Sequence, residues 1–174
     1  MLFFLYAEVL ACNIRANPAI SGLVLPGEPE PLPVISQYAD DTTMVAVSDQ
    51  AITAIFTTYS LFEKGSGSHL NLGKCKGLWL GPWKDRQDPP VDLQWSSDKI
   101  KVIGLYIGLG VSDEDNWRPR ISAVENVLNS WCQRSLSLNG RALIVNSLAL
   151  SRIWYVASLV HMPDSVLREL NTAL

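Results

Sequence analysis

Apolar residues dominate the first sixteen positions of the chain, with little of the polar spacing that would mark one exposed face. They fall on all sides of a helical projection and include Phe3, Phe4, Leu5, Val9, Leu10 and Ile14. A helix that is apolar all round is normally buried. The pattern therefore predicts a buried helix over residues 2–16. Asn17-Pro18 ends it, because the residue before proline avoids the helical region.

Two apolar, β-branched runs between residues 34 and 47 flank the pair Asp40-Asp41. Val, Ile, Thr and Tyr favour a pleated, half-buried surface, whereas aspartate disfavours one. This pattern predicts a β-hairpin with Asp40 and Asp41 at or beside its tip. Further strands are expected over Ile20–Leu25, Lys76–Leu80 and Ile100–Ile107. Loops rich in proline, glycine and serine are expected over 22–33 and 81–98.

Helical spacing of apolar residues returns in four later segments. Ile52, Ile55, Phe56, Tyr59 and Phe62 predict a core-facing helix that Ser48-Asp49 begins and Gly65 ends. Helices are also expected over 116–134, over 141–160 and after Pro163-Asp164. Strands and helices followed by a helical bundle predict an α+β fold. The loop over 81–98 divides it into regions 1–98 and 99–174.

Composition limits the class of protein. The chain has 174 residues, of which 48% are hydrophobic, so a folded core is expected rather than disorder. The net charge is −3, with −5 over residues 1–98 and +2 over 99–174. The three cysteines have no zinc spacing, and buried free thiols are expected. No apolar run is long enough to span a membrane, and neither a signal peptide nor membrane association is expected.

The adjacent carboxylates of Asp40 and Asp41 are the strongest candidate chemistry. Side chains alternate along a strand, so two consecutive aspartates reach one ion only where the chain turns. Magnesium binds through one or two carboxylates together with substrate phosphates, and paired metal ions serve polymerases and nucleases. Aspartates are also ordinary turn residues, and that alternative stays open at this point.

The motifs around this pair resemble those of the reverse transcriptases of non-LTR, LINE-type retrotransposons. Tyr38-Ala39-Asp40-Asp41 is similar to the aromatic-x-Asp-Asp box, motif C, of that family. Downstream, the chain carries further similar blocks in the same order, namely Ser66-Gly67-Ser68-His69-Leu70-Asn71-Leu72-Gly73-Lys74, Ile103-Gly104, Leu136-Ser137-Leu138-Asn139-Gly140-Arg141 and Trp154-Tyr155. The resemblance identifies 1–98 as part of a polymerase palm, and 99–174 as a primer-grip strand and helical thumb.

The resemblance implies two-metal nucleotidyl transfer by an RNA-directed DNA polymerase, with RNA template, DNA primer and Mg²⁺ or Mn²⁺. Asp40 and Asp41 would be the catalytic and metal-binding residues. Tyr38, Lys74 and Gly104 would lie near nucleotide or primer, although Lys74 is equally explained as a solvated strand-edge lysine. Arg118, Arg120, Arg141 and Arg152 could hold nucleic-acid phosphates, although each is also an ordinary solvated helix charge. The family also implies an intracellular, nuclear location.

The same resemblance implies that parts of the enzyme lie outside this sequence. The family places a third carboxylate on a strand before the first helix seen here, and the fingers and an endonuclease domain are also expected elsewhere. We therefore expect the chain alone to be nearly inactive and prone to aggregate. A non-catalytic RNA- or DNA-binding module, a retrotransposon relic, and an unrelated α+β domain are the alternatives. Trp117, Trp131 and Trp154 are expected in the core rather than as base-stacking residues.

Overall fold

The computed structural model describes residues 2–24, 26–27, 29, 31 and 34–173. These residues confirm the mixed fold class, with helices and three two-stranded sheets among the described elements, paired as β1–β2, β3–β4 and β5–β6. The chain separates into two compact units, Met1–Ile103 and Gly104–Leu174. Each unit has its own hydrophobic cluster. No described helix is both long enough and apolar enough to cross a membrane.

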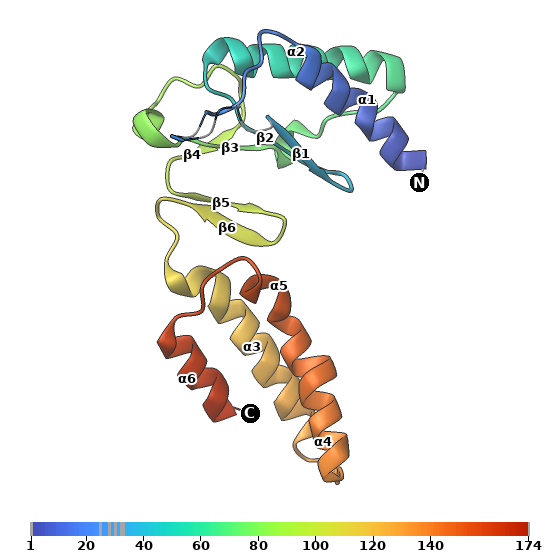
Figure 1. The fold of residues 1–174 in the computed structure, drawn as a ribbon, viewed down its shortest axis with the longest axis vertical. Coiled ribbons are helices and arrows are strands. Elements are labelled where there is room, and N and C mark those ends of the chain that lie inside the picture. The colour runs from blue at the N-terminus through green and yellow to red at the C-terminus, as the bar shows by residue number, and fades with distance from the viewer. Residues whose placement is uncertain (1, 25, 28, 30, 32–33, 174) are drawn as a thin grey trace. The chain divides into compact units, whose positions relative to one another are not determined.

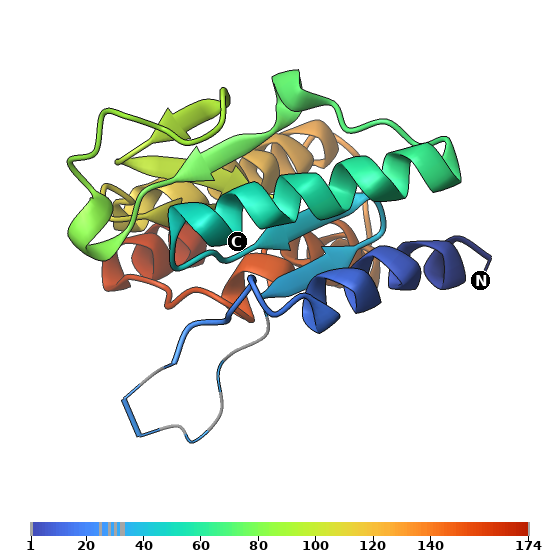
Figure 2. The same cartoon turned by 90° about the horizontal axis from the view of Figure 1, so that it is seen from above.

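The first unit begins with helix α1 (Leu2–Ala16), followed by strands β1 (Ile35–Tyr38) and β2 (Asp41–Met44) and helix α2 (Asp49–Ser66). Figures 1 and 2 show α1 and α2 over one face of the β1–β2 hairpin. Ser48 caps α2 by accepting a hydrogen bond from the Ala51 amide. The core of this unit consists of Leu10, Ala11, Ile14, Ile20, Val34, Ile35 and Ile55.

The rest of the first unit is short and irregular. The 3₁₀ turn η1 (Leu72–Lys74) leads into β3 (Lys76–Leu78), and a second turn, η2 (Gly81–Trp83), precedes β4 (Gln94–Ser96) and β5 (Lys99–Val102). Strands β3 and β4 pair in parallel, whereas β1 and β2 are antiparallel. The predicted loop over 81–98 therefore contains a strand, which the polar sequence around Gln94 did not indicate.

The second unit contains β6 (Leu105–Gly108), α3 (Asp113–Trp131), α4 (Leu138–Ile144), α5 (Trp154–Ala157) and α6 (Asp164–Ala173). A π-helical turn η3 (Val145–Ala149) and a 3₁₀ turn η4 (Leu150–Arg152) join α4 to α5. Helix α3 lies between α6 and this irregular segment (Figure 1). Trp117, Ile121 and Val124 of α3 lie at the centre of the hydrophobic core of this unit. This second core consists of Leu105, Trp117, Ile121, Val124, Ala149, Ile153, Val156, Val166 and Leu170.

Several local predictions were wrong. Helix α1 is not buried all round, because Leu10 and Ile14 face the core while Phe4 and Val9 are 68% and 52% exposed. The strand expected over Ile20–Leu25 is absent from described residues 20–24, and Leu25 lies outside the described residues. The helix expected over 141–160 begins earlier and is interrupted by η3 and η4.

Three further predictions were also wrong. The single strand expected over Ile100–Ile107 is two strands, because Ile103 and Gly104 have φ of 45° and 81° and turn the chain. Positive φ at both central residues is the pattern of a type I′ turn. Trp154 was expected in the core but is 60% exposed, whereas Trp117 is fully buried. The cysteines are free as expected, but Cys12 and Cys132 are exposed rather than buried.

Candidate active-site hairpin

The β1–β2 hairpin brings three of the predicted site residues together. Tyr38 pairs with Asp41 as the last step of the antiparallel ladder, and Ala39 and Asp40 form the two-residue turn. Ala39 has φ of 52°, the left-handed region that side chains rarely adopt. A positive φ at only the first central residue is the sign pattern of a type II′ turn, where glycine is usual. The predicted hairpin with aspartates at its tip is confirmed.

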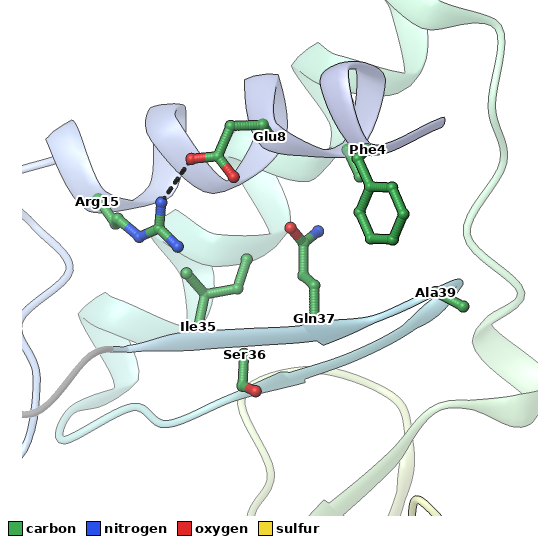
Figure 3. Close-up of a pocket in the computed structure, with 8 residues that line it drawn as sticks. Phe4, Glu8, Arg15, Ile35, Ser36, Gln37 and Ala39 are labelled. Carbon is green, nitrogen blue, oxygen red and sulfur yellow. Dashed lines mark hydrogen bonds and ion pairs between the residues drawn. The ribbon is translucent and has the colours of Figure 1, made fainter. Parts of the chain in front are cut away.

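The two faces of this hairpin differ. Figure 3 shows Ile35 and Gln37 pointing toward α1 and Ser36 pointing away from it. Side chains alternate along a strand, and cross-strand partners share a face. Tyr38 and Asp41 therefore lie on the same face as Ser36, turned away from α1. Asp40 and Asp41 are both exposed, so their carboxylates are open to solvent and to a cation.

Buried contacts hold the base of the hairpin. Val34 and Ile35 are 6% and 4% exposed and pack in the first core with Ile14 of α1. The Val45 amide donates to the Val34 carbonyl at 2.8 Å and extends the pairing beyond the strands. The apolar residues that flank Asp40-Asp41 thus anchor the hairpin at its base, while its tip projects from the core.

The residues of this hairpin supply only part of a metal site. Two carboxylates on adjacent residues match the oxygen ligands that magnesium prefers. Within the part of the chain that the structure describes, no group of three or more histidine, cysteine, aspartate or glutamate side chains is placed to hold a metal ion. Asp40 and Asp41 therefore supply carboxylates of the kind that magnesium binds, but the described residues place no third such side chain with them.

A pocket of about 330 Å³ lies on the opposite face of the hairpin, between β1 and α1 (Figure 3). Its polar lining includes Gln37 and the ion pair in which Arg15 Nη1 lies 2.8 Å from Glu8 Oε1. Sequence reasoning did not predict this pocket, because the helical spacing of Glu8 and Arg15 is typical of an ordinary solvated face. The pocket is on the other side of the strand from Tyr38 and Asp41.

Lys74 lies in the same unit, but on a different segment. It is an exposed residue at the end of η1, directly before β3. The segment is tied to α2 by the Glu63 carboxylate, which accepts a hydrogen bond from the Leu70 amide. Burial raises the pKa of the neighbouring Cys75 thiol, which favours its neutral form. The structure therefore fixes the start of the Lys74 segment, while the lysine side chain stays in solvent.

An aromatic and ionic cluster that sequence reasoning missed fixes the start of α2. Arg86 donates hydrogen bonds of 2.5 and 2.7 Å to the two carboxylate oxygens of Asp49, the first residue of α2. Its guanidinium carbon lies 5.1 Å and 5.2 Å from the ring centroids of Trp79 and Trp83. Trp95 stacks on Trp79 with centroids 3.9 Å apart. Because α2 follows β2 closely, this cluster holds the helix that continues from the hairpin.

The second unit carries the other predicted site residues, in different surroundings. Arg120 Nη2 donates to the Gly104 carbonyl at 3.4 Å. Arg118 forms ion pairs with Glu114 and Glu169, which raise the pKa of its guanidinium. Arg141 and Arg152 are exposed. The four arginines thus differ, because Arg118 links α3 to α6 while Arg141 and Arg152 face solvent.

Comparison with known proteins gives one informative similarity. No family model matches the chain. Over 159 residues it is 32% identical to the transposon TX1 uncharacterized 149 kDa protein of Xenopus laevis. The aligned region covers 88% of this chain and 12% of that protein, so the chain spans about an eighth of the length of the relative it matches. The chain is therefore similar, over most of its length, to a protein of a transposon.

Proposed function

We propose that this chain is part of an RNA-directed DNA polymerase of a LINE-type retrotransposon. The observation that carries the proposal is the exposed Asp40-Asp41 pair at the tip of an anchored β-hairpin, with Tyr38 beside Asp41 on one face. The similarity to a transposon protein supports the same origin. On this assignment residues 1–98 belong to the palm, and residues 99–174 are the primer-grip and thumb region. Its location in the cell would be nuclear.

Asp40 and Asp41 would hold Mg²⁺ or Mn²⁺ together with a third carboxylate outside the described residues. When bound, the metal ions would supply charge neutralisation at the attacking and leaving oxygens. The chain's own contribution is positional. The turn at Ala39 and Asp40 places two consecutive carboxylates at one end of the hairpin, and the packing of Val34 and Ile35 holds that end in place.

Other residues would serve the RNA template, the DNA primer and the incoming nucleotide. Tyr38 would lie against nucleotide or primer, since its ring is exposed beside Asp41. Lys74 would neutralise phosphate charge or donate a proton to the leaving pyrophosphate. Gly104 would lie at the primer grip. Arg120, Arg141 and Arg152 would contact phosphates, whereas Arg118 is already paired with two glutamates.

Primer extension on an RNA template tests the proposal. The assay compares this chain, the same chain extended upstream in its reading frame, and the extended chain with Asp40→Asn and Asp41→Asn. We expect extension only by the long protein. We expect the double substitution to lower it by roughly a hundredfold or more, because metal coordination supplies several kcal/mol.

Thr42→Ala is the matched control, since Thr42 is exposed in the same hairpin but lies on its other face. Equal extension by the aspartate variant and the unsubstituted long protein would refute the assignment of the metal site. Primer extension by the chain without its upstream part would show that its own residues complete the metal site.

A non-catalytic module that binds RNA–DNA duplexes is the second candidate. Two observations favour it. The described residues contain no third carboxylate group placed to hold a metal ion, and Arg141, Arg152 and Trp154 are all solvent-exposed. Such a module would bind duplexes without metal, and its affinity would fall as salt rises because phosphate contacts release counterions. Unchanged affinity in the Arg141→Ala, Arg152→Ala variant would exclude this use of the two arginines.

A further inference from the structure

The segment between α3 and α4 carries an arginine followed three residues later by a serine. Of the eight arginines in the chain, Arg134 alone has a serine three residues later, which is Ser137. The residue three positions after each of the others is a proline, isoleucine, alanine, tyrosine or asparagine. An arginine at this spacing, with an apolar residue directly after the serine, is the pattern that arginine-directed serine/threonine kinases select. Here the apolar residue is Leu138.

The structure makes this segment accessible. Ser135, Leu136 and Ser137 belong to neither a helix nor a strand, and both serines are exposed. The backbone of Ser137 is extended, with φ of −61° and ψ of 163°, and Leu138 is 82% exposed. The Arg134 guanidinium lies 4.2 Å from the centroid of the Trp131 ring, an exposed contact of modest strength that a stronger anionic partner can replace.

The helix that follows can open at low cost. Protein kinases bind their substrates as extended chain, so the first turn of α4 must unwind to admit Leu138 and Asn139. None of the residues of α4 is buried. Local opening is easiest where few buried apolar contacts must be broken. The hydrogen bonds that opening would break include those from the Gly140 amide to Ser137 Oγ at 3.2 Å and from the Arg141 amide to the Ser137 carbonyl at 2.9 Å.

We propose that Ser137 is a phosphorylation site for an arginine-directed serine/threonine kinase and that the resulting phosphate pairs with Arg141. In this step the bond between the γ-phosphorus of ATP and its bridging oxygen breaks, releasing ADP, while a bond forms between that phosphorus and Ser137 Oγ. The hydroxyl proton leaves through the catalytic base of the kinase. Arg141 lies one helical turn later, close enough for its guanidinium to form charge-assisted hydrogen bonds with the phosphate.

The test is phosphorylation of the whole chain by the purified catalytic domain of calcium/calmodulin-dependent kinase II, with site mapping by mass spectrometry. We expect phosphate on Ser137 and an initial rate about tenfold lower for Arg134→Ala, the loss expected when a charge pair at an interface is broken. Ser135→Ala, one residue from the arginine, should keep the native rate. Ser137→Asn should abolish incorporation while keeping the helix cap, because asparagine caps as well as serine.

Amide hydrogen exchange tests the pairing with Arg141. Exchange of the Gly140 and Arg141 amides should slow by about tenfold in the phosphorylated chain, because the phosphate adds charge-assisted hydrogen bonds to this turn. In phosphorylated Arg141→Ala, the Gly140 amide should show at most a small slowing. Phosphate on Ser135 instead of Ser137, or equal rates for the native chain and Arg134→Ala, would overturn the site. Equal slowing without Arg141 would overturn the pairing.

Discussion

Tyr38 and Asp41 face each other across the last paired step of the β1–β2 ladder. Because cross-strand partners share a face, the phenol ring and the carboxylate leave the hairpin on the same side. The turn that joins them consists of Ala39 and Asp40 alone. The geometry of the candidate site thus depends on a two-residue turn whose first residue, Ala39, has a positive φ of 52°.

Ala39→Gly should stabilise the chain. A left-handed backbone destabilises a residue with a Cβ by about 1–2 kcal/mol, and glycine avoids this cost. Glycine also has more conformational freedom in the unfolded chain, which offsets about 0.4–1 kcal/mol of the gain. We expect a net gain of roughly 0.5–1 kcal/mol in the free energy of unfolding. Urea titration measures it. Ala39→Val should lower stability, since β-branched residues tolerate this conformation least. A loss of stability with glycine would contradict the conformation assigned to the turn.

Gly77→Ala should be destabilising. A Cβ built on Gly77 would lie 2.2–2.6 Å from ring atoms of Trp95, which stacks on the buried Trp79. Overpacking of this kind typically costs about 1–3 kcal/mol. Gly65→Ala is the matched control, because a Cβ there meets no atom within 4 Å. Since Gly65 is helical, that change should leave the unfolding free energy unchanged or raise it by up to about 1 kcal/mol. Chemical denaturation of both variants compares them directly.

The Asp49–Arg86 pair should make stability depend on pH in the acid range. The hydrogen bonds from Arg86 lower the pKa of the Asp49 carboxyl below its ordinary value. A group with a lowered folded-state pKa stabilises the fold above its unfolded pKa, about 3.9, and loses that contribution as pH falls through the folded value. Asp49→Asn should therefore melt at a lower temperature than the native chain at pH 7, and this difference should narrow below about pH 4.

Asp88→Asn provides the comparison for that measurement. Asp88 also contacts Arg86, at 3.1 Å, but its side chain is far more exposed than that of Asp49. Exposed ion pairs contribute little to stability. Thermal melts between pH 2.5 and pH 7 should therefore separate the two variants. If the difference in melting temperature between the native chain and Asp49→Asn does not change with pH, the carboxylate charge is not what stabilises the start of α2.

Trp117 should contribute far more to stability than Trp154. The Trp117 ring is fully buried in the second core, and its Nε1 donates to the His161 carbonyl at 3.0 Å. Trp117→Ala should cost about 3–5 kcal/mol, and Trp117→Phe should cost less because the aromatic volume is largely kept. Trp154→Ala, at a 60% exposed position, should change the unfolding free energy by less than about 0.5 kcal/mol. Similar losses for both alanine variants, measured by urea titration, would contradict the burial described here.

The sequence by itself determined the candidate site's local structure. Two β-branched runs interrupted by Asp40-Asp41 predict a hairpin, because β-branched residues favour a pleated sheet and aspartates favour a turn. Helical spacing likewise predicted α2, α3 and α6, whose faces carry Ile55, Trp117 and Leu170. These predictions succeeded because each depends on neighbours only a few residues away.

Only the tertiary structure decided which surfaces are covered and which distant residues meet. The spacing of Arg86, Trp79 and Asp49 contains no signal that they form one cluster, since no local rule links residues that far apart. Nor could periodicity show that α1 buries Ile14 but exposes Phe4, or that Trp154 faces solvent. Burial depends on what packs against a helix, and the sequence of that helix alone does not contain its neighbours.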